Sequence, residues 1–218
     1  MKKLNDAVSS ISHFFGAIVS IPISLVLVGV GAYFGNAWYA VSFAIFGLSL
    51  FMLYSASTIY HLIPSKVGTE GIKLVARKID HMMIFVLIAG SYTPVCLITL
   101  RGVWGYTMIT IIWVIAFLGI VFKSFGVSDN KLVRNISTGL YLLMGWIAII
   151  AIVPLINAMS TLSFVLLCLG GLSYTVGAVI YAVKKPTIKV EWLDFHDVFH
   201  FFVLLGSTFH IIMMFTLL

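Results

Sequence analysis

Charged residues are scarce in this 218-residue chain: Asp, Glu, Lys and Arg make up 9% of it, and the acidic residues are the rarer sign. Ordinary soluble domains carry about 25% charged and about 45–50% apolar residues, whereas 61% of this chain is hydrophobic. So little charge cannot cover a folded domain with a hydrated surface. The composition therefore excludes a soluble globular protein and predicts one that is solvated by lipid.

Cysteine is almost absent as well, with only Cys96 and Cys168. Both lie inside apolar segments and form no Cys-x-x-Cys pair, so the sequence offers neither a redox motif nor a thiolate metal site. We interpret both as buried small hydrophobic residues.

Long polar segments are also lacking, and the apolar residues fall into seven runs of roughly 18–24 residues, the length that crosses about 30 Å of hydrocarbon as a helix. The first run is too long for the apolar region of a signal peptide and is followed by no cleavage site, so we expect it to stay in the mature protein. The connections are short. We predict an all-α integral membrane protein with a single seven-helix transmembrane domain over residues 1–218. The predicted spans are Ile11–Phe34, Trp38–His61, Ile79–Leu100, Tyr106–Phe122, Ile136–Ile156, Leu162–Val183 and Phe195–Leu218.

The basic residues lie almost entirely on one side of these spans. Of the 13 Lys and Arg residues, only Arg101 falls on the other side. The positive-inside rule therefore predicts a cytoplasmic N-terminus and an extracytoplasmic C-terminus, and the net charge of +6 needs no nucleic-acid partner. The basic side carries Lys2, Lys3, Lys66, Lys73, Arg77, Lys78, Lys123, Lys131, Arg134, Lys184, Lys185 and Lys189.

Ionisable residues within membrane spans are costly and mark functional sites. Five of them are predicted to lie in one layer near the cytoplasmic boundary: His61 ends span two, Asp80 lies in the first turn of span three, His196 and His200 lie in the first two turns of span seven, and His13 begins span one. A sixth, His210, lies about 15 Å beyond His200. This layer is the candidate site.

His196 and His200 are four residues apart, which places both imidazoles on one helical face where they can hold one cation. With His61 as the third ligand, three neutral imidazoles would match the usual catalytic zinc site. The alternative interpretation is that the histidines are interfacial residues that bind no metal.

Two further residues are candidates for the chemistry. Ser57 lies one turn before His61 on the same face, where it could orient a water or a substrate oxygen; the alternative is a hydrogen bond to its own helix. Asp80 could take a proton from that water or fix a histidine tautomer, and the alternative is a pairing with Arg77 or Lys78. We expect His81 to face the headgroups and Asp197 to stabilise the start of its helix.

These motifs resemble those of the hemolysin III group of bacterial membrane proteins, within the progestin and adipoQ receptor family that includes the adiponectin receptors. The motifs in family order are Ser57-x3-His61, Asp80, the segment Gly90-Ser91-Tyr92-Thr93-Pro94 and His196-x3-His200. The resemblance covers essentially the whole chain. It implies seven spans, a bacterial plasma-membrane location, and a zinc ion held by the three histidines with Asp80 and Ser57 next to its water.

The opening motif of the family is only partly kept. Where the family has Glu-x2-Asn-x3-His, this chain has Asp6-x2-Ser9-x3-His13. His13 is therefore a supporting candidate beside the metal ligands.

The resemblance and the residues leave three functions open. The first is a zinc-dependent intramembrane hydrolase of a lipid amide or ester, similar to the ceramidase activity linked to the adiponectin receptors. The second is a membrane-permeabilising cytolysin, as the group name suggests, although the sequence has no polar stripe through its spans. The third is a non-enzymatic sensor of membrane lipids with a structural zinc. In each case membrane lipids are the expected partners, and for the hydrolase a lipid-like substrate occupies a cavity inside the membrane.

Overall fold

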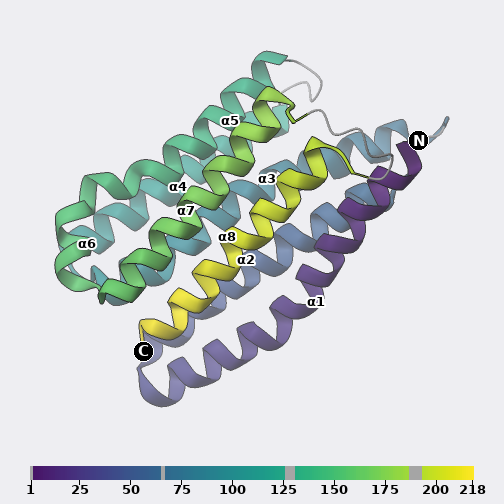
Figure 1. Cartoon of the computed structure of the whole chain (residues 1–218). Coiled ribbons are helices and arrows are strands. Elements are labelled where there is room, and N and C mark those ends of the chain that lie inside the picture. Colours follow the sequence, from purple (N-terminus) through teal and green to yellow (C-terminus); the bar gives the residue numbers. More distant parts are fainter. Residues whose placement is uncertain (1, 65–66, 126–130, 187–192) are drawn as a thin grey trace.

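The computed structural model describes residues 2–64, 67–125, 131–186 and 193–218. Figure 1 shows long helices that run side by side, with the N- and C-termini at opposite ends of the bundle. The basic residues Lys66 and Lys189 lie outside the described residues, as do the side chains of Lys2, Lys3, Asp6 and Lys131.

Seven helical segments of the described chain are long and apolar enough to cross a membrane, which confirms the predicted number. The third of them ends in a π-helical turn after α3, and the fifth is interrupted by a 3₁₀ turn between α5 and α6. The elements are α1 (Lys2–Phe34), α2 (Ala37–Leu62), α3 (Glu70–Pro94), η1 (Val95–Thr99), α4 (Val103–Phe125), α5 (Lys131–Trp146), η2 (Ile147–Ala151), α6 (Ile152–Ala158), α7 (Thr161–Val183) and α8 (Phe195–Thr216).

The third span begins nine residues earlier than predicted. Helix α3 starts at Glu70 rather than Ile79, so Asp80 lies about 15 Å along it, and its predicted place in the first turn is wrong. The reason is that hydropathy marks the part of a helix that lies in hydrocarbon, whereas the helix itself continues through a segment that carries Lys73 and Arg77.

Helix α2 packs against both α1 and α3, and small residues bring these helices close together. Gly90 of α3 lies against Ser49 of α2, and Gly47 of α2 lies against Ser24 of α1, with no room for a Cβ at either glycine. Close approach through small residues is the usual way in which helices associate in lipid. Apolar side chains gain no hydrophobic free energy there by moving from lipid into a contact between helices. These contacts fix α3, and thereby Asp80, relative to α2.

Side chains of the segment Gly90-Ser91-Tyr92-Thr93-Pro94 form hydrogen bonds with several backbone carbonyl and N–H groups. Ser91 and Thr93 donate hydrogen bonds to the carbonyls of Leu87 and Ala89 in their own helix. The Tyr92 hydroxyl donates to the carbonyls of Met144 and Gly145 and accepts from Ala148 N–H, each within 3.0 Å. It therefore holds the fifth span at the point where α-helix gives way to the 3₁₀ turn. This turn ends at Ala151, three residues before Pro154, which has no N–H to donate.

The outer surface is apolar. Large side chains such as Phe15, Leu25 and Val153 are about two-thirds exposed, as expected for helices that contact lipid chains. Cys96 is buried as predicted, but the prediction for Cys168 is wrong because this residue is exposed on α7. A small apolar residue can face hydrocarbon as well as a protein core.

Candidate metal centre

The position of His61 follows from the end of α2. Pro64 restricts the preceding residue to an extended backbone, and Ile63 accordingly has φ −72° and ψ 117°. The helix therefore stops at Leu62, with His61 in its last turn. The Lys73 ammonium donates to the Ile63 carbonyl at 2.8 Å and so satisfies one of the backbone groups left open there.

The start of α8 fixes the other two histidines. The Asp194 side chain accepts from His196 N–H and Asp197 N–H, and the Asp197 side chain accepts from Asp194 N–H, which together form a capping box. The predicted role of Asp197 at the helix start is confirmed. Because the helix begins at Phe195, His196 and His200 lie in its first two turns on one face.

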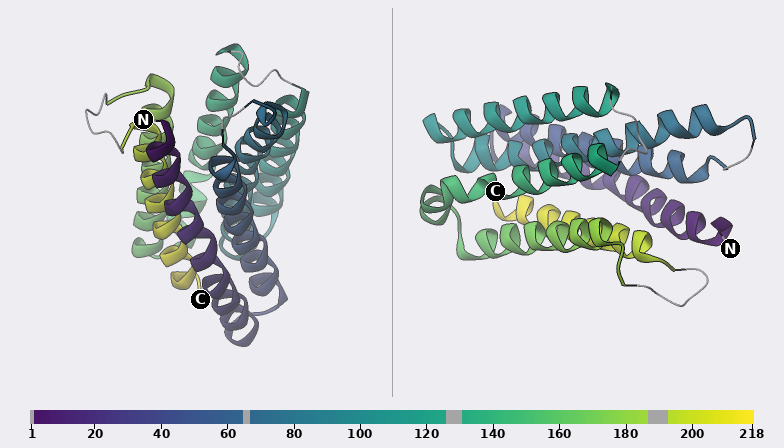
Figure 2. Two further views of the ribbon diagram at one scale, coloured as in Figure 1. Left: turned by 90° about the vertical axis from the view of Figure 1, so that its right-hand side faces the viewer. Right: turned by 90° about the horizontal axis from the view of Figure 1, so that it is seen from above.

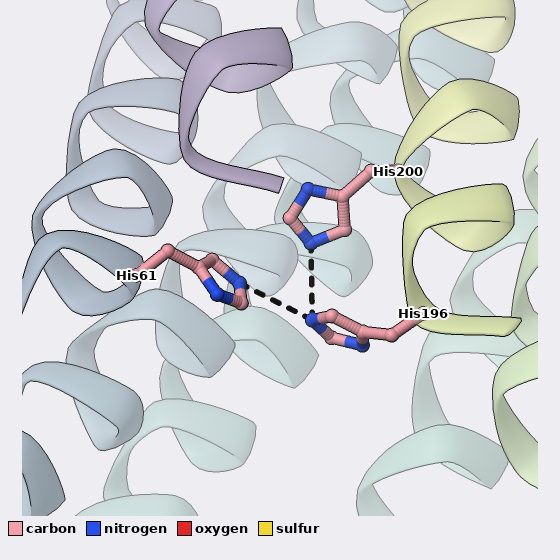
Figure 3. Close-up of side chains that lie close together, drawn as sticks. All are labelled: His61, His196 and His200. Carbon is pink, nitrogen blue, oxygen red and sulfur yellow. Dashed lines mark hydrogen bonds between the residues drawn. The ribbon is translucent and has the colours of Figure 1, made fainter. Parts of the chain in front are cut away.

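The three histidines meet between α2 and α8 (Figure 3). The Nε2 atom of His196 lies 3.2 Å from that of His61 and 3.1 Å from that of His200. Nitrogens on a tetrahedral zinc with bonds of about 2.0–2.1 Å would be about 3.3 Å apart. One ligand atom from each residue lies within 4.8 Å of the others, so the group can hold a metal ion.

His13 and Ser9 support this group from α1. The His13 ring stacks on that of His200, with centroids 3.8 Å apart and planes 18° apart, and it meets the Tyr54 ring edge-on. Ser9 Oγ donates to Asp197 Oδ1 at 2.6 Å, in a buried hydrogen bond between the first and last helices. The partly kept opening motif thus contacts α8 through both its serine and its histidine.

Asp80 and Ser57 face each other across α3 and α2. Both are buried, at 8% and 1% exposure, and they interact electrostatically. Ser57 Oγ makes no hydrogen bond to a carbonyl group of its own helix, which was the alternative interpretation of this residue. The charged group that acts on Asp80 is Lys123 of α4, instead of the predicted Arg77 or Lys78.

His81 is a residue that the sequence interpretation misplaced. It was expected to face the headgroups, but its Nε2 lies 3.3 Å from the hydroxyl of Tyr181 on α7, and its carbonyl accepts from Tyr141 of α5. The interior of the bundle is wide enough here that two adjacent residues of α3, about 100° apart on the helix, both line it. Nothing in the sequence distinguished Tyr141, Tyr181 and Lys123 from other single polar residues in or next to the predicted spans.

A cavity of about 320 Å³ begins at the histidines and runs into the bundle. Its wall follows α8 from His196 to His210, which corresponds to about 21 Å along the helix. Polar groups gather at one end, where His13, Ser57, Asp80, His196 and His200 line it. The rest of the wall is mostly apolar, with side chains such as Leu87, Val95, Met108, Leu155 and Phe164. Its volume lies in the range of small-molecule and lipid sites, about 300–1,000 Å³.

Comparison with known proteins places this arrangement in a family. The sequence profile of the haemolysin-III related family matches residues 1–211. The Hemolysin-3 homolog of Bacillus subtilis (strain 168) is 42% identical over 202 residues, which cover 93% of this chain and 89% of that protein. Hemolysin-3 of Bacillus cereus is 38% identical over 202 residues, which cover 93% of this chain and 86% of that protein. The chain is therefore a multi-pass membrane protein that belongs to the haemolysin-III related family.

Proposed function

We propose that this protein is a zinc-dependent hydrolase that cleaves an amide or ester bond of a membrane lipid. The observation that carries the proposal is the meeting of three imidazole nitrogens at one end of a long apolar cavity, beside a buried carboxyl group and a buried hydroxyl group. Imidazole ligands suit zinc, and three protein ligands leave one coordination position for chemistry.

Each polar residue has a separate task in this proposal. His61, His196 and His200 would hold the ion, which supplies a Lewis acid that polarises a carbonyl group and acidifies water. Asp80 accepts a proton during attack and returns it to the leaving group. Ser57, whose buried Oγ lies beside the Asp80 side chain, donates to the oxygen that becomes negatively charged. His13 holds the His200 ring in place by stacking.

The shape of the cavity supports a lipid substrate. An acyl chain is long and apolar, and the cavity is lined mostly by apolar side chains from the histidines as far as His210. A bond near the headgroup of such a lipid would lie at the polar end, next to Asp80 and Ser57. A ceramide-like amide is the specific candidate, by resemblance to the adiponectin receptors.

The test combines metal content and turnover in the purified full-length protein. We expect about one zinc per chain by elemental mass spectrometry and little in the His196→Ala, His200→Ala double variant, because one imidazole cannot hold the ion. The Asp80→Asn variant is expected to keep its zinc but lose lipid-amide hydrolysis by at least about a hundredfold, the usual contribution of a general acid–base residue.

His210→Ala serves as the matched histidine control, since it removes a buried imidazole of the same helix, about 15 Å along the helix from His200. It should leave the zinc content unchanged. Full hydrolysis by Asp80→Asn, or zinc retention by the double variant, would contradict the proposal.

A second candidate function comes from the name Hemolysin-3 of the Bacillus cereus relative. A protein that permeabilises membranes as a pore would need a polar passage, whereas the cavity described above is mostly apolar beyond its histidine end. Haemolysis that survives the Asp80→Asn substitution would favour this candidate, and the absence of haemolysis by wild-type protein would exclude it.

A further inference from the structure

Two more polar side chains line the cavity deep in the bundle, away from the three histidines that could hold a metal ion. They are His210 of α8 and Tyr174 of α7, whose ring centroids lie 5.3 Å apart, and we call them the deep polar pair. His210 lies about 15 Å along α8 from His200. Polar side chains at such a depth in a membrane protein are costly and mark functional sites.

A glycine on the facing helix makes room for each ring. A Cβ at Gly170 of α7 would lie 2.5 Å from two atoms of the His210 ring, and a Cβ at Gly206 of α8 would lie 2.6 Å from the Tyr174 ring. Each ring therefore lies against the backbone of the other helix, in a space that a larger residue would fill. The close approach of α7 and α8 holds both rings at the cavity wall.

A chain of hydrogen bonds positions the Tyr174 hydroxyl group. Its oxygen lies 2.9 Å from Ser207 Oγ of α8, and Tyr54 of α2 donates to the same Oγ at 2.6 Å. Ser207 and Tyr54 are each 2% exposed, so this chain begins in the protein interior and ends at Tyr174 in the cavity. A tyrosine hydroxyl group both donates and accepts, so Tyr174 can form a further hydrogen bond with a bound molecule.

The His210 ring lacks a hydrogen-bond donor. It is 6% exposed, and among the residues that the structure describes none donates a hydrogen bond to either ring nitrogen. The Leu167 carbonyl of α7 faces the ring and can accept from one nitrogen only. A neutral imidazole has one donating and one accepting nitrogen. The accepting nitrogen is therefore buried without a donor, which is costly unless a bound molecule supplies one.

A hydroxyl group on a lipid chain fits both members of the deep polar pair. Its proton can be donated to the accepting nitrogen of His210, and its oxygen can form a hydrogen bond with the Tyr174 hydroxyl group. The carbon atoms on either side of it would contact a cavity wall that is mostly apolar. A plain acyl chain would leave the His210 nitrogen without a donor.

We propose that the deep polar pair binds a hydroxyl group carried on the acyl chain of a lipid, so that the cavity selects hydroxylated chains over plain ones. The inference rests on the proposed function in one respect, namely that a lipid chain fills the cavity. With the carbonyl group of the lipid at the histidine end, the hydroxyl group lies about 15 Å along the chain, which is a mid-chain position.

Retention of two fatty acids by the purified full-length protein tests this without hydrolysis. Stearic acid and a stearic acid hydroxylated at mid-chain present the same carboxyl group to the histidine end, and native mass spectrometry measures how much of each is retained. We expect wild type to bind the hydroxylated acid at least about fivefold more tightly, as for one buried hydrogen bond. His210→Leu and Tyr174→Phe should each reduce this preference while they retain stearic acid as wild type does, which shows that the cavity is still formed.

Tyr141→Phe is the matched control. It removes the hydroxyl group of a cavity-lining tyrosine that donates to the His81 carbonyl at 2.8 Å, at the histidine end, and it should keep the preference. Equal retention of both acids by wild type would overturn the proposal and assign the deep polar pair to packing or to a bound water. A loss in Tyr141→Phe as large as in His210→Leu would overturn it as well.

The two proposals fail in different measurements. A retained preference for the hydroxylated acid in a protein without zinc or hydrolysis would contradict only the proposed function. Zinc-dependent hydrolysis of a lipid amide without that preference would contradict only the assignment of the deep polar pair.

Discussion

At the scale of single residues, Ser9 shows how one hydroxyl group ties distant parts of the chain together. Its hydrogen bond to Asp197 is buried and joins residues 188 positions apart. We predict that Ser9→Ala lowers the free energy of unfolding by about 1.5–3 kcal/mol, the usual contribution of a hydrogen bond to a charged group. The measurement is the thermal unfolding midpoint of the protein in detergent.

Ser12→Ala is the control for this prediction. The Ser12 hydroxyl group donates only to the Ser9 carbonyl of its own helix, so its removal should change the free energy of unfolding by less than about 0.5 kcal/mol. Equal effects of the two substitutions would show that the contact between α1 and α8 contributes nothing specific.

At the scale of helices, the approach of α2 to α3 places Ser57 opposite Asp80. A Cβ at Gly90 would overlap the Ser49 side chain, so Gly90→Ala must push the two helices apart. We predict a loss of about 1–3 kcal/mol in the free energy of unfolding, as for other overpacked interfaces. Thermal unfolding together with zinc content would measure both the loss of stability and any displacement of His61.

Gly139→Ala on α5 serves as the control for the helix contact. A Cβ there would meet nothing within 4 Å, and alanine favours a helix over glycine by up to about 1 kcal/mol. The control should therefore be neutral or stabilising. A neutral Gly90→Ala would mean that α2 and α3 do not need this close approach.

At the scale of the whole molecule, the two termini lie at opposite ends of the bundle (Figure 2), and with seven candidate spans we expect them on opposite sides of the membrane. From the positive-inside rule we predict that the N-terminus and the histidine end face the cytoplasm of a bacterial plasma membrane. Reporter fusions to the C-terminus measure this: alkaline phosphatase should be active there and green fluorescent protein should not. The opposite result would place the three histidines outside the cell.

The site was only partly predictable from the sequence. The spacing of His196 and His200 places both on one face of any helix, and His61 ends an apolar run, so the three histidines could be grouped from pattern alone. Asp80 could be named but not placed correctly, because the start of α3 at Glu70 depends on a helical extension that hydropathy does not register. The predicted environment of His81 was wrong because the sequence does not show how wide the interior of the helix bundle is.

The sequence by itself determined the class of protein, the seven spans and the three histidines that could hold a metal ion, because composition and helical periodicity are local properties that need no partner segment. Only the tertiary structure decided which residues share the cavity. The burial of Lys123, the pairing of His81 with Tyr181 and the stacking of His13 on His200 depend on how far helices from distant parts of the chain approach one another. The distance between helices is set by the packing of one helix on another, such as Gly90 against Ser49. It therefore cannot be predicted from the sequence of a single helix.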